Sequence, residues 1–280
     1  LPDPFLFDQL KDSTREVRSK SPQTVVFEKT TRVIDWLVRS NYEVVFRGDQ
    51  PLSERVIFPV SEDESNGIED ARFVRFSDAG IEGRYYATYT AYNGYSIMPM
   101  LLETNDFVRF RMRTLNGEAA RNKGMALFPR KVNGLYTMIS RQDGENLYIS
   151  QSDNIHLWNE VKELQRPKCS WEFIQIGNCG SPIETRMGWL LLTHGVGPLR
   201  RYCIGAELLD LQDPSKIIGK LKEPLIIPNE YEREGYVPNV AYTCGAIIHN
   251  DVLVGPYGVS DTSTCVATID LRTLLDRLTE

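Results

Sequence analysis

Residues 67–92 read GIEDARFVRFSDAGIEGRYYATYTAY, in which two runs rich in β-branched and aromatic residues flank a glycine-containing turn. Such a pattern predicts a β-hairpin. Comparable pairs of runs recur along the chain. Their first strands are marked by Phe73, Phe128, Ile183 and Ala246, at steps of 55, 55 and 63 residues. Small sheets repeated at this period are typical of a β-propeller, whereas a β-sandwich, the alternative all-β fold, would show evenly spaced strands without a longer period.

The first forty residues differ from this β pattern. Apolar residues such as Leu6 and Leu10 recur there at three-to-four spacing with charges between them, and Ser21-Pro22 interrupts the pattern. This spacing predicts two helices. We therefore expect a helical lead-in over residues 1–40, which would mediate self-association or cap the propeller, and a β-propeller catalytic domain over residues 41–280.

The composition limits the class of protein and of partner. Of the 280 residues, 41% are hydrophobic and 25% are charged, which is typical of a folded globular chain. The net charge of −6 offers no positive field for nucleic acid, and the absence of any run of about 18 apolar residues argues against a membrane partner. The five cysteines are odd in number and lack metal-ligand spacing, so we expect no metal site and reduced thiols in a cytoplasmic protein. Phosphate-loop, dinucleotide, serine-hydrolase and zinc-peptidase motifs are also missing from the sequence.

Two carboxylates and an arginine precede the first repeat. Residues 67–72, GIEDAR, place Glu69, Asp70 and Arg72 directly before a β run. The inner strands of a propeller converge on its axis, so polar residues next to them face one shared funnel. A carboxyl group beside other charges in a partly dry funnel can have its pKa moved toward the working pH, as a general acid requires. A surface ion pair in a turn is the other interpretation.

Basic residues occupy the matching place one repeat later. Arg121, Asn122 and Lys123 precede the next first strand, and Arg141 ends that repeat's second strand. Guanidinium groups bind phosphate or carboxylate through two parallel hydrogen bonds, and lysine adds a point charge. These residues predict an anion pocket or, alternatively, a solvated basic turn. His194 closes the apolar strand GWLLLTHGV, where it is either a structural residue or a ligand contact.

Six stretches, taken in order, resemble glycoside hydrolase family 130, the β-mannoside phosphorylases and related β-mannosidases: GIEDARF, YYATYTAY, RNKGMALFPRKVNGLYTMISR, GNCGSPIETRMGWLLLTHGVG, YCIGAELLDLQDPSKIIG and EGYVPNVAYTCGA. The resemblance runs from about Tyr42 to the C-terminus. It implies a five-bladed β-propeller and an inverting phosphorolysis of β-mannosides, in which the mannosyl group is transferred to inorganic phosphate to give α-mannose 1-phosphate. Phosphate is then a co-substrate, and no cofactor is implied.

The resemblance also implies roles for individual residues. Asp70 is the general acid, which protonates the glycosidic oxygen through a mannose hydroxyl. Arg121 with Asn122, Arg141 and His194 hold the phosphate, which attacks the anomeric carbon from the opposite face. When phosphate is the nucleophile no enzymic base is needed, but cations must hold a doubly charged anion in line.

Further residues belong to the same expected site. The charge of Lys123 places it with the phosphate-binding residues. Arg72, Asn122 and Asp261 are expected near the sugar, and Asp261 resembles the late aspartate of the family that contacts mannose hydroxyls. Glu184 stands where we expect a lysine in some phosphorylases. It is therefore expected to contact substrate, and in a hydrolase it would act as the base.

Departures from the family pattern leave other interpretations open. A complete first blade is not found before residue 42, and residues 42–60 look like the outer part of one further blade. The first blade is therefore expected to be incomplete, either because the helices replace it or because the chain is N-terminally incomplete. Tyr89, Tyr92 and Tyr236 are candidate platforms on which a sugar would stack. The alternatives to a phosphorylase are an inverting β-mannosidase and a non-catalytic glycan-binding propeller.

Overall fold

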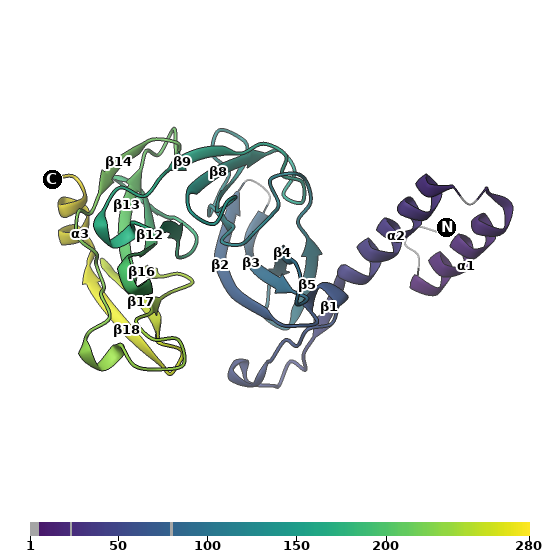
Figure 1. Cartoon of the computed structure of the whole chain (residues 1–280), viewed down its shortest axis with the longest axis horizontal. Helices are drawn as coiled ribbons and strands as arrows, with labels where there is room; N and C mark the ends of the chain where they lie inside the picture. The colour runs from purple at the N-terminus through teal and green to yellow at the C-terminus, as the bar shows by residue number, and fades with distance from the viewer. Residues whose placement is uncertain (1–5, 23, 79–80) are drawn as a thin grey trace.

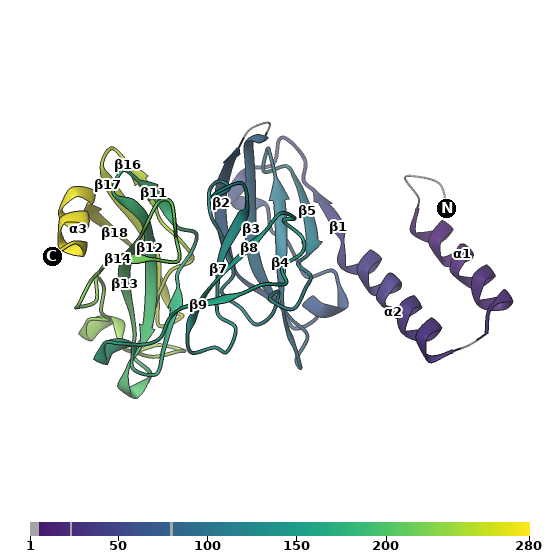
Figure 2. The same ribbon diagram turned by 90° about the horizontal axis from the view of Figure 1, so that it is seen from above.

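A computed structural model of the chain describes residues 6–22, 24–78 and 81–280. Within these ranges the strands form four antiparallel sheets, and each sheet is built from one contiguous stretch of chain. Figures 1 and 2 show the sheets between the helical lead-in at one end of the molecule and the C-terminal helix at the other. No helix in the described ranges is long and apolar enough to cross a membrane.

The lead-in forms two helices, as predicted. They are α1 (Phe7–Lys20) and α2 (Val25–Ser40). The hydroxyl oxygen of Thr24 accepts a hydrogen bond from the backbone N–H of Phe27 at 3.1 Å and so caps the start of α2. Residues 1–5, which also belong to the expected lead-in, lie outside the described residues.

The first sheet contains β1 (Tyr42–Val45), β2 (Ile68–Asp78), β3 (Ile81–Tyr92), β4 (Ile97–Thr104) and β5 (Arg109–Thr114). Its strand order is β1-β5-β4-β3-β2. Tyr42 and Val44 of β1 pair with Met112 and Phe110 of β5, and all four side chains belong to one apolar cluster. The expectation that residues 42–60 form part of a further blade is therefore wrong for β1. It is the edge strand of the first sheet, because its apolar side chains complete that face.

The remaining sheets follow in chain order. The second contains β6 (Ala126–Leu127), β7 (Tyr136–Ser140), β8 (Leu147–Ser152) and β9 (Lys162–Gln165). The third contains β10 (Gln175–Asn178), β11 (Ile183–Thr185), β12 (Gly188–Val196), β13 (Tyr202–Leu209) and β14 (Ile217–Lys220). The fourth contains β15 (Ala241–Tyr242), β16 (Ile247–His249), β17 (Val252–Val259) and β18 (Ser263–Asp270).

Short helices connect or end these sheets. Helix α3 (Leu271–Leu278), which the sequence analysis did not predict, follows β18 and begins where the Asp270 carboxylate accepts a hydrogen bond from the backbone N–H of Thr273 at 2.8 Å. Single turns of 3₁₀ helix occur at η1 (Leu52–Glu54), η2 (Glu62–Glu64), η3 (Ser170–Glu172), η4 (Pro198–Arg200) and η5 (Glu230–Glu232).

The sequence repeat corresponds to a propeller-like arrangement. The predicted first strands are β2, β6, β11 and β16, and each pairs with the strand that follows it, namely β3, β7, β12 and β17. The fold is therefore all-β with four blade-like sheets and a helical lead-in. The expected five blades are not confirmed, because the described residues form only four sheets.

Apolar clusters lie between successive sheets and hold them together. One cluster joins the first sheet to the second and contains Phe76 and Met138; the next joins the second to the third and contains Phe128 and Trp189. A further cluster joins the third sheet to the fourth and to α3. Each buried side chain of this size contributes about 1.5–3 kcal/mol to folding.

The helical lead-in projects away from the sheets in both views (Figures 1 and 2). The end of α2 and the residue after it are tied to the rest of the chain: Trp36 Nε1 donates to Asp63 Oδ2 at 2.5 Å, and the Asn41 side chain accepts from the backbone N–H of Thr114 at 3.1 Å. The expectation that the lead-in caps the propeller is therefore wrong, because most of the hairpin has no sheet beneath it.

Candidate active site

Asp70 lies at an irregularity in β2. Glu69 pairs with Thr90 of β3 and Arg72 pairs with Thr88, so that Asp70 and Ala71 together face a single residue of β3. This two-against-one pairing is a β-bulge. Asp70 has a φ of 59°, a left-handed conformation that aspartate tolerates better than most residues. The bulge therefore re-aims the Asp70 carboxyl group relative to a regular strand.

Arg72 and Tyr242 hold the Asp70 carboxyl in place. Arg72 Nη1 donates to the Asp70 carbonyl oxygen at 3.1 Å, and Arg72 Nη2 donates to Asp70 Oδ2 at 3.2 Å. The Tyr242 hydroxyl, from β15, donates to the same Oδ2 at 3.2 Å. Arg72 is buried, which works against its charge, but Tyr242 and Asp70 outweigh burial and raise its pKa. Asp70 and Arg72 thus form a partly buried ion pair and not an exposed pair in a surface turn.

Arg141 is a buried cation beside this pair. It is 6% exposed, and its Nη1 lies 3.5 Å from His194 Nε2. With the Gln175 amide oriented by its hydrogen-bond partners, the Gln175 oxygen accepts from Arg141 Nη1 at 2.6 Å. Arg141 Nε has no hydrogen-bond partner, and no carboxylate among the described residues lies within ion-pair distance of Arg141. Burial, and then the charge of Arg72, lower its pKa. Such a charge is stabilised by a bound anion.

His194, on β12, is neutral in this setting. Burial lowers its pKa well below the ordinary value, and the charges of Arg141 and Arg72 lower it further. Its Nε2 lies beside Arg141 Nη1. Within the described part of the chain, Nδ1 has no hydrogen-bond partner. The ring stacks on Tyr202 at 5.9 Å and meets Tyr242 edge-on at 5.1 Å. The His194 ring is therefore held in a fixed position.

The loop of residues 121–124 lies against Arg141. Arg121 Nε donates to Gln142 Oε1 at 3.0 Å, and a Cβ placed on Gly124 would lie 3.1 Å from Arg141 Nε. Lys123 Nζ donates to Glu69 Oε1 at 3.1 Å, beside Asp70, and its charge contributes to the lowered pKa of His194. Asn122 is left-handed at φ 61° and accepts a hydrogen bond from the Lys123 backbone N–H. The predicted basic residues thus lie next to the predicted group of Glu69, Asp70 and Arg72.

This arrangement places an acid beside a group of cations. Asp70 and Arg72 come from the first sheet, Lys123 and Arg141 from the second, and His194 from the third. Among the described residues, Arg141 Nε and His194 Nδ1 have no hydrogen-bond partner, and leaving a buried donor unpaired costs about 1–3 kcal/mol. No group of three histidine, cysteine or acidic side chains in the described ranges could hold a metal ion.

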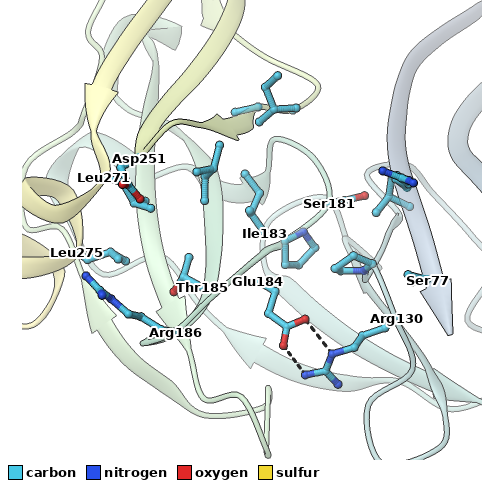
Figure 3. Close-up of a pocket in the computed structure, with 18 of the residues that line it drawn as sticks. Ser77, Arg130, Ser181, Ile183, Glu184, Thr185, Arg186, Asp251, Leu271 and Leu275 are labelled. Carbon is cyan, nitrogen blue, oxygen red and sulfur yellow. Dashed lines mark hydrogen bonds and ion pairs between the residues drawn. The ribbon is translucent and has the colours of Figure 1, made fainter. Parts of the chain in front are cut away.

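Glu184 is not brought into this cluster. Its carboxylate accepts two hydrogen bonds from Arg130, at 2.6 and 2.8 Å, and Figure 3 shows the two side chains facing each other. They line a cavity of about 1160 Å³ whose described walls include Phe73 and Ile247 but not Asp70, Arg141 or His194. The expectation that Glu184 contacts substrate or acts as a base at this site is not supported, because its charge is already neutralised elsewhere.

Asp261 lies apart as well. It is exposed, in the turn between β17 and β18, with a φ of 54°. In the described ranges, Asp261 forms no hydrogen bond or ion pair with Asp70, Arg72 or Tyr242, so its role in holding the sugar stays a prediction.

The tyrosines proposed as sugar platforms differ in their surroundings. Tyr89 is only 4% exposed and donates to Glu64 Oε1 at 2.7 Å, so the prediction that it stacks on a sugar is wrong. Its hydroxyl is used inside the first sheet. Tyr92 is partly exposed and Tyr236 is largely exposed, and their roles stay predictions.

Sequence reasoning missed four residues of the site: Gln142, Gln175, Tyr202 and Tyr242. A signal existed for Tyr242. It stands in VAYTCGA, directly before the first strand of the last repeat, the position that GIEDARF occupies in the first. Gln142, Gln175 and Tyr202 gave no such signal, because neutral side chains do not stand out in a charge pattern.

Fold and site together define a propeller-like protein in which a carboxyl group lies beside several buried cationic and polar side chains. The chain belongs to glycoside hydrolase family 130: the sequence profile of that family, described as beta-1,4-mannooligosaccharide phosphorylase, matches residues 41–280. The family resemblance expected from the six stretches is thereby confirmed.

Named relatives agree with this assignment. The chain is 34% identical over 228 residues to a 1,2-beta-oligomannan phosphorylase of Thermoanaerobacter sp. (strain X514), covering 79% of this chain and 74% of the relative. It is 31% identical over 230 residues to a beta-1,2-mannobiose phosphorylase of Listeria innocua serovar 6a, covering 79% of this chain and 63% of the relative.

A solved structure is also similar. The structure of a beta-1,2-mannobiose phosphorylase from Listeria innocua, in complex with beta-1,2-mannobiose, matches with a TM-score of 0.71 at 29% identity. The match covers 82% of this chain and 64% of that one. The chain thus spans about two thirds of the length of these relatives.

Proposed function

We propose that this protein is an inverting phosphorylase of β-mannosides, which transfers a mannosyl group to inorganic phosphate. The curated relatives that support this proposal are named as phosphorylases of β-1,2- or β-1,4-linked mannosides. These relatives, at about 30% identity, share the reaction type but differ in the linkage that they are named for. The reaction type is therefore better supported than the linkage.

In the proposed reaction, Asp70 gives its proton to the leaving oxygen, directly or through a mannose hydroxyl, as the glycosidic bond breaks. A phosphate oxygen attacks the anomeric carbon from the opposite face, and the phosphate proton returns to Asp70 or to solvent. The products are α-mannose 1-phosphate and a sugar shortened by one residue. Asp70 acts as a general acid, a role that contributes about 10²–10⁴-fold to a rate.

The observation that carries the proposal is the buried Arg141. Its Nε and the Nδ1 of neutral His194 lack partners, and no carboxylate in the described ranges neutralises the guanidinium. Phosphate provides both the negative charge and the acceptor oxygens that these groups need. Arg121, Asn122 and Lys123 complete the proposed phosphate pocket, and Arg72, with Asp261, is proposed to contact the sugar.

The proposal is tested by measuring α-mannose 1-phosphate release from β-1,2- and β-1,4-mannobiose, with and without phosphate. We expect release only with phosphate, and the anomeric proton of the first product observed by NMR to show the α configuration. Equal turnover in phosphate-free buffer would identify a β-mannosidase instead.

The non-catalytic alternative is tested separately with Asp70→Asn. A catalytic Asp70 predicts a loss of at least about 10²-fold in rate with an unchanged fold. A glycan-binding propeller would show no turnover before or after the change, only binding.

The number of blades and the cellular compartment also belong to this proposal. We propose that the active protein contains the five blades of its family and acts in the cytoplasm. The five cysteines are present as free thiols, which is compatible with a reducing compartment.

A further inference from the structure

Tyr242 joins the two halves of the candidate site. Its hydroxyl oxygen accepts a hydrogen bond from Arg72 Nη2 at 2.5 Å and donates to Asp70 Oδ2 at 3.2 Å, while its ring meets His194 edge-on at 5.1 Å. The residue belongs to β15 of the fourth sheet, whereas Asp70 and Arg72 belong to the first. The apolar clusters join only successive sheets, so this polar contact links the last sheet directly to the first.

We propose that Tyr242 is a positioning residue that decides which oxygen of Asp70 carries the catalytic proton. A tyrosine hydroxyl has one proton to donate. Because Arg72 donates to the hydroxyl oxygen, that proton is directed to Asp70 Oδ2. Arg72 Nη2 donates to the same Oδ2. An oxygen that accepts two hydrogen bonds is not available to hold the acid proton, so the proton of neutral Asp70 resides on Oδ1.

This inference rests on the proposed role of Asp70 as general acid. It gives the left-handed backbone of Asp70 a purpose: the bulge turns the carboxyl so that Oδ2 accepts hydrogen bonds from Tyr242 and Arg72. Without the Tyr242 hydroxyl, the carboxyl loses one of the donors that orient it and keeps Arg72 and the Cys244 thiol as partners. A misplacement of about 1 Å is enough to cost about 10²-fold in rate.

Burial shifts the pKa of several titratable side chains around Asp70 away from neutral pH. Burial first, and then the Asp70 carboxyl, raise the pKa of the Cys244 thiol to about 12, and burial also raises the pKa of the Cys179 thiol and of the Tyr242 hydroxyl. The neighbouring Arg72 and Arg141 guanidinium groups stay charged, and the His194 pKa lies well below its ordinary value. A shift in the alkaline limb of kcat/KM between two variants therefore reports on Asp70.

The test is Tyr242→Phe, which keeps the ring and removes only the hydroxyl. We expect kcat to fall about 10- to 100-fold, while KM for phosphate changes little. The Tyr242 hydroxyl donates to Oδ2, so its removal disfavours the charged form of the carboxyl. Since the acid must be protonated, the pH at which activity is lost on the alkaline side moves upward.

A matched control is Tyr257→Phe, in the same sheet. Its hydroxyl donates to Glu232 Oε1 at 2.9 Å, outside the site, so this variant also loses one hydroxyl-to-carboxylate hydrogen bond. We expect it to keep the wild-type kcat and pH profile. In the Asp70→Asn background, Tyr242→Phe should cost little more, because Tyr242 acts through Asp70.

The outcomes separate the two proposals. If Asp70→Asn keeps wild-type activity, the proposed function is wrong. If Asp70→Asn is inactive but Tyr242→Phe matches wild type in kcat and pH profile, only the role of Tyr242 is overturned. Should Tyr242→Phe fail to fold, replacing Tyr242 with 3-fluorotyrosine keeps its size and makes it a stronger donor. The alkaline limb should then move downward, and an unchanged limb would overturn the proposal.

Discussion

At the scale of single residues, the site depends on whether each charged side chain already has a partner. Arg130 and Arg141 carry the same guanidinium group, but Arg130 donates two hydrogen bonds to Glu184 whereas Arg141 is buried without a carboxylate partner in the described ranges. The unpaired one is therefore the candidate for binding substrate phosphate. This difference is not visible in the sequence, where both follow similar apolar strands.

The first prediction follows for Arg141→Lys. A lysine keeps the charge but cannot form two parallel hydrogen bonds, so we expect KM for phosphate to rise about 10- to 100-fold with a smaller change in kcat. Initial rates at varied phosphate concentration measure this. Arg130→Lys is the matched control, and an equal rise in that variant would show that the effect is not specific to the pocket.

The second prediction concerns Glu184→Gln. Because Glu184 is paired with Arg130 in a separate cavity, we expect phosphate-dependent turnover to remain at the wild-type rate. The same assay with and without phosphate decides the matter. Loss of turnover confined to phosphate-free buffer would instead restore Glu184 as the base of a hydrolase.

At the scale of elements, the bulge in β2 is held by a buried carboxylate just before it. Glu64 is fully buried and accepts hydrogen bonds from the backbone N–H groups of Val60 and Ser61 and from the hydroxyls of Tyr42 and Tyr89. Tyr89 is the residue of β3 that faces the bulge. Glu64 therefore fixes both the chain entering β2 and the strand opposite Asp70.

The third prediction is that Glu64→Gln lowers the free energy of unfolding by about 1–3 kcal/mol, because an amide group cannot accept all of these hydrogen bonds. Chemical denaturation measures the change. Exposed Glu62, in the same 3₁₀ turn, provides the control: Glu62→Gln should unfold like wild type, and a similar loss in both variants would contradict a specific role for Glu64.

The fourth prediction is the pH dependence of that difference. Burial alone would raise the pKa of Glu64, but the hydrogen bonds from Ser61, Tyr89 and Val60 outweigh it and lower the pKa below its ordinary value of 4.5. The stabilisation is therefore complete above the unfolded pKa of about 4.3 and is lost as the pH falls through the lower folded pKa. The stability gap between wild type and Glu64→Gln should shrink below about pH 4, and a constant gap would contradict the prediction.

At the scale of the whole molecule, the projecting lead-in offers a surface to a second copy. Val26 and Val33 lie on one face of α2, seven positions apart, and are 73% and 53% exposed. Apolar residues so exposed on a helix are typical of an interface. The earlier expectation of self-association is therefore kept as a prediction, while capping of the propeller is not.

The fifth prediction is that the protein self-associates through this face. Light scattering after size-exclusion chromatography should give a mass above 32.0 kDa for wild type and close to it for the double variant Val26→Lys, Val33→Lys. Lys29→Gln, on the same helix, should behave as wild type. A monomeric wild-type protein would refute the idea.

Local patterns predicted what depends on local sequence. The hairpin of residues 67–92, the repeat steps and the break between the two helices are all set by residues close together in the chain, and the structure confirms them. The pairing of β1 with β5 joins residues about 70 positions apart, and no local signal marks it. Helix α3 was missed because its eight residues follow a strand without a break.

The same distinction holds for the candidate site. Asp70 and Arg72 are neighbours in the sequence, and a charge pattern was enough to single them out. Tyr242 reaches Asp70 only when the last sheet returns to the first, 172 positions later, so a pattern search along the chain cannot find the contact. Glu184 was selected because the family resemblance predicts a lysine there in some members, and its pairing with Arg130, 54 positions away, is not visible in the sequence.

The contiguous build of the sheets has a consequence for biosynthesis. Each sheet draws its strands from one stretch of chain, so strands can pair in the order in which they leave the ribosome. The exception is the edge strand β1, whose partner β5 is made about 65 residues later. Until Thr114 emerges, Tyr42 and Val44 lack their strand partners Met112 and Phe110. A pause in translation within that interval would therefore leave an apolar edge open to other nascent chains.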